Sequence, residues 1–242
     1  MTQGEKRVAI VQSNYIPWKG YFDLINTVDE FIVYDDVQYT RRDWRNRNRI
    51  RTPRGVAWLT IPVRVKGRYH QRIDETRVSD PNWAKTHWKT IQHNYAAAPH
   101  FSGYGERFEA AYRGADSDRL TDINRLFIGL ICEILGIATP ITSSSDYGAG
   151  GRKTERLVNL CLGAKAAEYV TGPAAKAYLD ERAFRDAGIA ISYIDYSGYP
   201  EYQQRLPCFE HAVTVLDLIC NTGSRARSYM KTFGQRVADG GA

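Results

Sequence analysis

Short apolar runs alternate along the chain with segments whose apolar residues recur every three or four positions. Residues 7–11 and 30–34 have the apolar and β-branched content of buried strands. Residues 20–28, between them, are predicted to form a short helix. A crossover of this length between two buried strands implies a parallel pair with a right-handed connection.

The middle of the chain is predicted to be mostly helical. Residues 56–63 resemble a further strand, which Pro62 should end or place at a sheet edge. Apolar stripes and end signals predict helices over 81–95, 105–115 and 121–135. Strand and helix patterns then alternate again, with helix 153–162, strand 168–171, helix 174–187, strand 189–193 and a final helix 209–220.

This order of elements predicts a Rossmann-like α/β fold with a parallel sheet, in one domain that spans residues 1–242. Residues 81–140 are expected as a helical insertion between two α/β portions. The basic stretch 224–242 is expected as a frayed tail.

Composition narrows the class of protein. The 242 residues are 43% hydrophobic and 25% charged, enough for a core and without an apolar tract of ~18 residues that could span a membrane. The start of the chain lacks the pattern of a signal peptide, so a cytoplasmic location is expected. The net charge of +6 allows an anionic ligand without choosing one.

The four cysteines are widely separated, so neither a zinc site nor a disulfide framework is expected. Cys132, Cys161 and Cys220 sit among aliphatic residues and are expected to be buried, whereas Cys208 lies in a predicted loop. No metal site and no cofactor are predicted.

The loop directly after the first strand is crowded with amide and aromatic side chains. In open α/β sheets, ligands bind beyond the carboxyl ends of the strands, so this loop is a candidate pocket wall. The alternative is a packed loop whose tyrosines only reach toward water. Its candidate substrate-binding residues are Gln12, Asn14, Tyr15, Trp18 and Tyr21.

Candidate proton-transfer groups lie elsewhere along the chain. Asp35 and Asp36 follow the second strand, and alternation lets at most one face the crevice; a solvated turn is the alternative. His87 lies on an apolar helical stripe, where a core histidine is the default, and His211 opens the last predicted helix. Asp35, His87 and His211 are the candidate catalytic residues.

Two basic segments are candidates for anion binding. The run 41–51 contains Arg47 and Asn48 and has three interpretations: phosphate or acidic-substrate binding, nucleic-acid contact helped by Trp44, or a solvated face. Lys153 follows a glycine-rich stretch at a predicted helix start, which suits an anion or a flexible connector.

Six strings in the chain together resemble the WbqC-like family, and the resemblance spans nearly the whole chain. They are QSNYIPWKGYF at 12–22, DDVQY at 35–39, WRNRNRI at 44–50, KTERL at 153–157, GPAAKAY at 172–178 and FEHAVTVLD at 209–217. The resemblance implies a place in the biosynthesis of O-antigen, other surface sugars or secondary metabolites. Gln38, within the second string, joins the candidate substrate-binding residues.

The first strand, loop and helix are also similar to the nucleotidylyltransferase arrangement. By that analogy Lys153 would be a late phosphate-binding lysine. Trp18 and Tyr21 lie near the places of the two signature histidines, which puts nucleotidyl transfer in doubt.

The leading hypothesis is a transferase that joins an acyl or aminoacyl group to an amine of a sugar or small metabolite, with an acyl-carrier protein as a candidate partner. In it Gln12, Asn14 and Asp35 orient the nucleophile, Tyr15 and Trp18 wall the pocket, His87 or His211 moves the proton, and Arg47 and Lys153 hold a phosphate. A nucleotide-dependent ligase or nucleotidyltransferase is the second hypothesis. A non-enzymatic nucleic-acid binder is the third and least favoured, and no membrane partner is expected.

Overall fold

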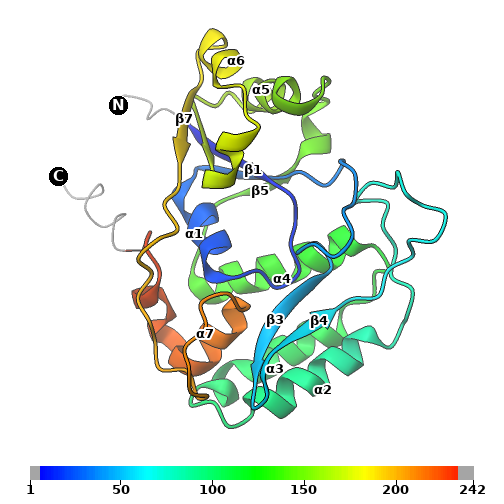
Figure 1. Cartoon of the computed structure of the whole chain (residues 1–242), viewed down its shortest axis with the longest axis vertical. Helices are drawn as coiled ribbons and strands as arrows, with labels where there is room; N and C mark the ends of the chain where they lie inside the picture. The colour runs from blue at the N-terminus through cyan, green and yellow to red at the C-terminus, as the bar shows by residue number, and fades with distance from the viewer. Residues whose placement is uncertain (1–5, 234–242) are drawn as a thin grey trace.

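Five short apolar segments form a parallel sheet at one end of an elongated molecule (Figure 1). The computed structural model describes residues 6–233. The sheet order is β5-β2-β1-β6-β7, and every neighbouring pair is parallel. The strands are β1 (Arg7–Val11), β2 (Glu30–Val33), β5 (Ile141–Ser143), β6 (Glu168–Thr171) and β7 (Ala190–Tyr193). The predicted Rossmann-like α/β fold is confirmed.

Alternation along β1 and β2 divides the core into two clusters. Ala9 and Phe31 point into one cluster with α1 (Lys19–Thr27) and α4 (Leu120–Leu135). Val8, Ile10 and Ile32 point into the other, with α5 (Lys153–Gly163) and α6 (Glu181–Asp186). The chain therefore winds outward from β1 in both directions. The switch point lies between β1 and β6, where such sheets open a crevice beyond their carboxyl ends.

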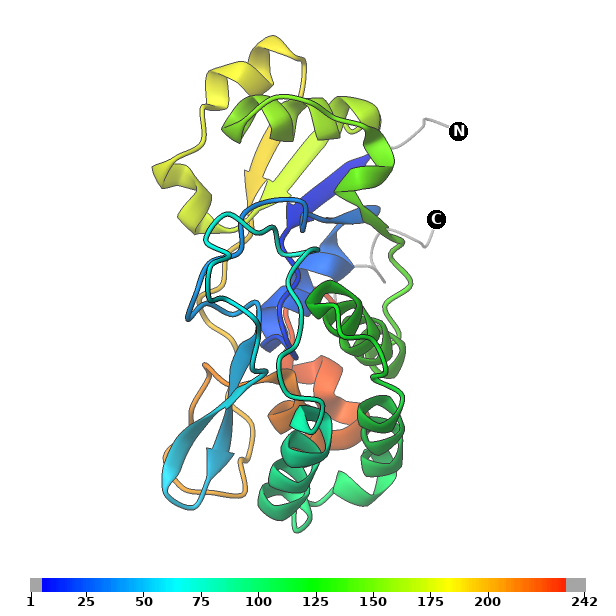
Figure 2. The same ribbon diagram turned by 90° about the vertical axis from the view of Figure 1, so that its right-hand side faces the viewer.

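A long connection, residues 34–140, leaves the sheet between β2 and β5. It contains an antiparallel hairpin, β3 (Arg47–Thr52) and β4 (Gly55–Thr60), then α2 (Trp83–Tyr95), α3 (Phe101–Arg113) and α4. Figure 2 shows the hairpin and the first two of these helices at the end of the molecule away from the sheet. The second half of the arginine-rich run 41–51 thus lies in a strand, β3. Strand β4 ends before Pro62, as predicted. The three helices lie within a few residues of their predicted bounds.

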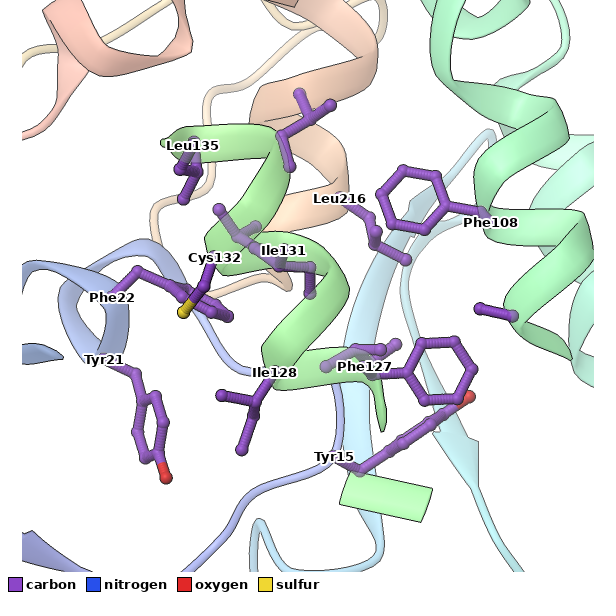
Figure 3. Close-up of a cluster of buried hydrophobic side chains, with 14 of the residues drawn as sticks. Tyr15, Tyr21, Phe22, Phe108, Phe127, Ile128, Ile131, Cys132, Leu135 and Leu216 are labelled. Atoms are coloured by element: carbon purple, nitrogen blue, oxygen red, sulfur yellow. The ribbon is translucent and has the colours of Figure 1, made fainter. Parts of the chain in front are cut away.

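Helix α4 forms the centre of the larger cluster. Figure 3 shows Phe127 and Ile131 of α4 among Tyr15, Phe108 and Leu216, which come from three other parts of the chain. Phe127 and Ile131 are fully buried. Cys132, Cys161 and Cys220 are buried as predicted, and Cys208 is exposed.

Two predicted helices are wrong in extent. Residues 174–187 form a 3-10 turn, η2 (Pro173–Ala177), and then the short α6, because the Asp180 side chain accepts the amides of Arg182 and Ala183 and starts a new helix. The last helix is α7 (Val215–Thr222), which begins six residues later than predicted, at the Thr214 cap.

The segment after α7 packs against the rest of the fold. Residues 223–229 form a 3-10 helix, η3 (Gly223–Tyr229), and Ala226 and Met230 are buried. Thr232 is bonded through its amide and hydroxyl to the carboxylate of Asp23. The first part of the predicted frayed tail is therefore ordered, and residues 234–242 lie outside the described residues. Within residues 6–233 no helix is long and apolar enough to cross a membrane.

Candidate functional site

A cavity of about 740 Å³ opens at the carboxyl ends of β1 and β6, the switch point of the sheet. The β1–α1 loop, the start of α5 and the segments after β6 and β7 form its walls. The polar and aromatic lining residues are Gln12, Asn14, Trp18, Tyr21, Tyr34, Trp44, Lys153, Thr154, Tyr169, Thr171, Tyr178 and Tyr196. A crevice of this size with a few polar groups among aromatic walls is typical of a small-molecule site.

The structure brings Gln12, Asn14, Trp18, Tyr21 and Lys153 together at this cavity. Lys153 is the first residue of α5, with a left-handed φ of 50°. The Glu155 carboxylate accepts the amide of Arg152 at 3.3 Å, so part of the predicted anion site is taken by the chain itself. The Thr154 hydroxyl oxygen accepts the amide of Asp180 at 3.2 Å, so its O–H group, together with the Lys153 ammonium, is what the wall offers a ligand here.

The β1–α1 loop is held by side chains from the long connection. The Asn48 amide donates to the carbonyl oxygens of Tyr15 and Ile16 at 3.1 and 3.0 Å. The Arg45 guanidinium donates to Asn14 Oδ1. Ile16 has a φ of 36°, which is strained for a β-branched residue and needs such support. Asn14 therefore lies in the cavity wall on a fixed backbone.

Asp35 also holds the β1–α1 loop in place, through hydrogen bonds to Ser13. Its carboxylate accepts the amide and hydroxyl of Ser13 at 2.8 and 2.6 Å and the hydroxyl of Thr121. Burial raises the pKa of Asp35, and these hydrogen bonds oppose the rise. Asp35 is only 4% exposed and does not line the cavity at the switch point. Its contacts fit a role in holding the loop.

Trp18 bends back over Gly20 and lines the cavity. A Cβ at Gly20 would lie 2.3 Å from the Trp18 ring, closer than real Cβ contacts allow. Trp18 also packs edge-on against Tyr196 and Tyr199, with ring centroids 5.2 and 5.6 Å apart. The backbone of Gly20, which has no Cβ, therefore leaves the space that this indole occupies.

Replacing Gly20 by alanine should therefore displace the Trp18 ring. We expect a shift in tryptophan fluorescence and a loss of about 1–3 kcal/mol of unfolding free energy, the usual range for overpacking. Gly103→Ala is the control, because nothing lies within 4 Å of a Cβ there. Unchanged fluorescence and stability in Gly20→Ala would contradict the placement of Trp18.

The structure places the two candidate histidines away from this cavity. His87 is 6% exposed, and its Nδ1 and Nε2 lie 2.8 Å from the Tyr15 hydroxyl and 3.2 Å from the Thr60 carbonyl oxygen. Burial lowers the pKa of His87 to about 4. Tyr15 is itself fully buried. His87 and Tyr15 thus belong to the core rather than to a cavity wall.

His211 is exposed, with its ring 4.5 Å from that of Phe209. Partial burial, followed by the charge of Lys19, lowers its pKa. Its neighbour Ala212 lines a smaller cavity of about 240 Å³, which Asn48 also lines.

Gln38 and Arg47 also lie outside the cavity wall. Gln38 donates to the carbonyl oxygen of Tyr69 at 3.0 Å. The Arg47 guanidinium stacks over Trp58 at 4.0 Å and donates to the carbonyl oxygen of Arg42. Both side chains are therefore engaged by their own chain.

Sequence reasoning missed several wall residues. They are Thr171 at the end of β6, Gly172 and Tyr178 after it, and Tyr196 after β7, and their position at the carboxyl ends of parallel strands could have indicated them. Arg45 was missed because its partners lie more than 30 positions away.

The chemistry of the lining is limited. None of the described residues that line the cavity of about 740 Å³ is an aspartate, glutamate, histidine or cysteine. No group of three or more such side chains that could hold a metal ion occurs within the part of the chain that the structure describes. The wall offers amide, hydroxyl, phenol and ammonium groups.

A known protein family matches the part of the chain that contains the site. The WbqC-like protein family matches residues 12–229, a span that contains nearly all of the cavity wall. The uncharacterized protein Rv1507c of Mycobacterium tuberculosis is 51% identical over 226 residues, which cover 93% of this chain and 98% of that protein. No solved structure matches the chain.

Proposed function

The chain belongs to the WbqC-like protein family, and on this premise we propose that it is a small-molecule transferase whose cavity between β1 and β6 holds an anionic donor. The observation that carries this proposal is the joint placement of Lys153 and Thr154 with Gln12 and Asn14 at the switch point. A lysine and a hydroxyl at one wall suit a phosphate, and the amides suit a carbonyl group at another. The aromatic side chains between them suit the body of the donor.

The reaction that we propose is acyl or aminoacyl transfer from a thioester to an amine. The amine nitrogen forms a bond with the carbonyl carbon, the carbon–sulfur bond breaks, and the thiolate that leaves takes up the proton of the amine. This balance needs no carboxylate or histidine in the wall, which agrees with the lining of the cavity. A role in the biosynthesis of surface polysaccharides or natural products is part of the proposal.

We propose that the acyl donor is attached to an acidic carrier protein. Trp44 lines the cavity, and its ring centroid lies 5.3 Å from that of Trp58 on the hairpin. The two residues are 39% and 45% exposed. The guanidinium groups of Arg47 and Arg49 lie over these rings. A basic and aromatic surface thus adjoins the cavity mouth, where a phosphopantetheine arm would enter.

The nucleic-acid hypothesis rests on the same arginine run. Arg47 and Arg51 donate to carbonyl oxygens of their own chain, at Arg42 and Pro207, which fixes their guanidinium groups but leaves their charges in place. Nucleic-acid binding that weakens steeply with salt would support this third hypothesis, and its absence would remove it. Nucleotide use stays the second candidate, favoured by the position of Lys153 beside the switch point.

Coenzyme A binding tests the donor site. We expect Lys153→Ala to weaken the affinity for coenzyme A about tenfold, since a hydrogen bond to a charged group is worth about 1.5–3 kcal/mol and about 1.4 kcal/mol is tenfold. Titration calorimetry at fixed salt is the measurement. Lys165→Ala is the matched control, because Lys165 is also exposed with a left-handed φ of 57° but does not line the cavity.

Two outcomes would redirect the proposal. Equal weakening by both substitutions would mean that only net charge matters. Tight binding of ATP or CTP with release of pyrophosphate, and none of coenzyme A, would replace acyl transfer by the nucleotide-dependent reaction.

A further inference from the structure

A second, smaller cavity of about 240 Å³ adjoins the cavity at the switch point. Asn14, Trp18 and Trp44 line both cavities, so these side chains form the wall between them. The smaller cavity is completed by Pro17, Asn48 and Ala212. It lies below the range of about 300–1,000 Å³ that is usual for drug-sized ligands, so it suits a molecule smaller than the proposed donor.

The orientation of the Asn14 amide follows from its partner. A guanidinium group only donates hydrogen bonds, so the contact of Arg45 with Asn14 requires the Oδ1 atom on that side. The same Nη1 atom lies 3.4 and 3.5 Å from the carbonyl oxygens of Gln12 and Ser13. The Nδ2 group of Asn14 is then the end of the side chain left for a ligand. Arg45 is 9% exposed and acts here as a positioning residue.

The walls of the smaller cavity indicate what it would take. Two indoles and a proline present flat apolar surfaces, which pack well against a ring. Its lining contains no carboxylate among the described residues. The buried Arg45 guanidinium lies behind Asn14, with its Nη1 atom on Asn14 and its Nη2 atom 3.6 Å from the Asp43 carboxylate, and the buried Asp35 carboxylate also interacts with it. The positive end of the Arg45–Asp43 pair is therefore the end that contacts the wall, and a positive charge there disfavours an ammonium and favours the free amine, which is the nucleophilic form.

We infer that the smaller cavity is an acceptor subsite for a ring-shaped primary amine, and that Asn14 contacts both substrates from the wall between the two cavities. The inference rests on the proposed acyl transfer. The Nδ2 group of Asn14 donates to the carbonyl oxygen of the donor, where negative charge develops when the amine attacks. The ring of the acceptor is aromatic or a pyranose, since both present an apolar face to indole.

Matched alanine substitutions separate the two cavities. Ala212 lines only the smaller cavity and Ala174 only the larger one, and neither is buried. The probes are acetyl-dethia-coenzyme A for the donor, in which a methylene group replaces the thioester sulfur and the carbonyl group is kept, and benzylamine or glucosamine for the acceptor, with calorimetry as the readout. Ala212→Phe should weaken amine binding at least tenfold and leave the coenzyme A analogue unchanged, and Ala174→Phe should do the reverse.

Asn14 and Arg45 are tested on the same probes. Asn14→Ala should weaken the coenzyme A analogue roughly threefold to tenfold, as expected for one lost hydrogen bond. In the parent protein, amine affinity should rise with pH as the free amine forms. Arg45→Met should flatten this rise, a change that mere loss of packing would not produce.

The outcomes distinguish the inference from the function on which it rests. Amine binding that survives Ala212→Phe, or no binding of either amine, overturns the acceptor subsite. Amine binding that Ala212→Phe abolishes, with no binding of the coenzyme A analogue by any variant, supports the subsite and overturns the thioester donor. Binding of benzylamine but not glucosamine would identify the ring of the acceptor as aromatic, and the reverse result would identify it as a pyranose.

Discussion

Replacing Asp35 by alanine should lower the free energy of unfolding by about 3–5 kcal/mol, because the Asp35 carboxylate takes three hydrogen bonds in the interior. The substitution leaves the Ser13 amide and the hydroxyls of Ser13 and Thr121 to find other partners, and each buried donor without one costs about 1–3 kcal/mol. Asn124 donates through Nδ2 to the Ser13 hydroxyl oxygen and to the carbonyl oxygen of Arg45, and turning its amide to offer Oδ1 to Ser13 would break both bonds. Chemical denaturation at neutral pH measures the loss.

Asp118→Ala is the control for this experiment. Asp118 pairs with Arg77 at the surface, where both side chains are about half exposed, at 54% and 42%. Exposed pairs of this kind contribute about 0–1 kcal/mol. A stable, folded Asp35→Ala variant without turnover would instead favour the catalytic role predicted from the sequence.

The position of the cavity could be predicted from the sequence, because the signals for it lie close together along the chain. An apolar run followed by a loop of amide and aromatic residues marks the end of a parallel strand, and Gln12, Asn14 and Trp18 do line the cavity there. Lys153 was found by the same logic at a helix start. Both signals lie within a few residues of the element that positions them.

The remaining site residues depend on partners far along the chain. An apolar helical stripe has the same sequence pattern whether its histidine faces a ligand or the core. His87 is shown to face the core by its hydrogen bond with Tyr15, which lies 72 positions away in the sequence. Arg45 likewise acquires its role only when the fold brings it to Asn14. The break in the predicted helix 174–187 was missed for a local reason, because a cap at Asp180 outweighed the apolar pattern.

The buried hydrogen-bond chain around His87 fixes its charge state. A carbonyl oxygen only accepts, so Nε2 must carry the proton that it donates to Thr60. Nδ1 then accepts from the Tyr15 hydroxyl, which lies 2.5 Å from that of Tyr112 and accepts from it. A proton on Nδ1 would break this chain and place a charge in the core. For this reason the neutral form is favoured, and the pKa of His87 falls to about 4.

Acid should therefore destabilise the protein through His87. The unfolded chain takes up the proton near the ordinary pKa of about 6.5, and the folded chain takes it up only near 4. Between these values the unfolded state binds more protons, so this contribution to stability is full above pH 6.5 and is lost as the pH falls toward 4. The loss amounts to about 3 kcal/mol.

The difference between the parent protein and His87→Gln isolates this contribution, since glutamine can donate to Thr60 and accept from Tyr15 without titrating. Asp35 and Asp217 have pKa values raised by burial, so their contributions run in the opposite direction, falling as the pH rises, and cancel in the difference. His93→Gln, on the exposed side of the same helix, should follow the parent curve. Unfolding free energies measured from pH 4 to 7.5 test this, and a His87→Gln curve parallel to that of the parent would mean that His87 is open to water and able to move a proton after all.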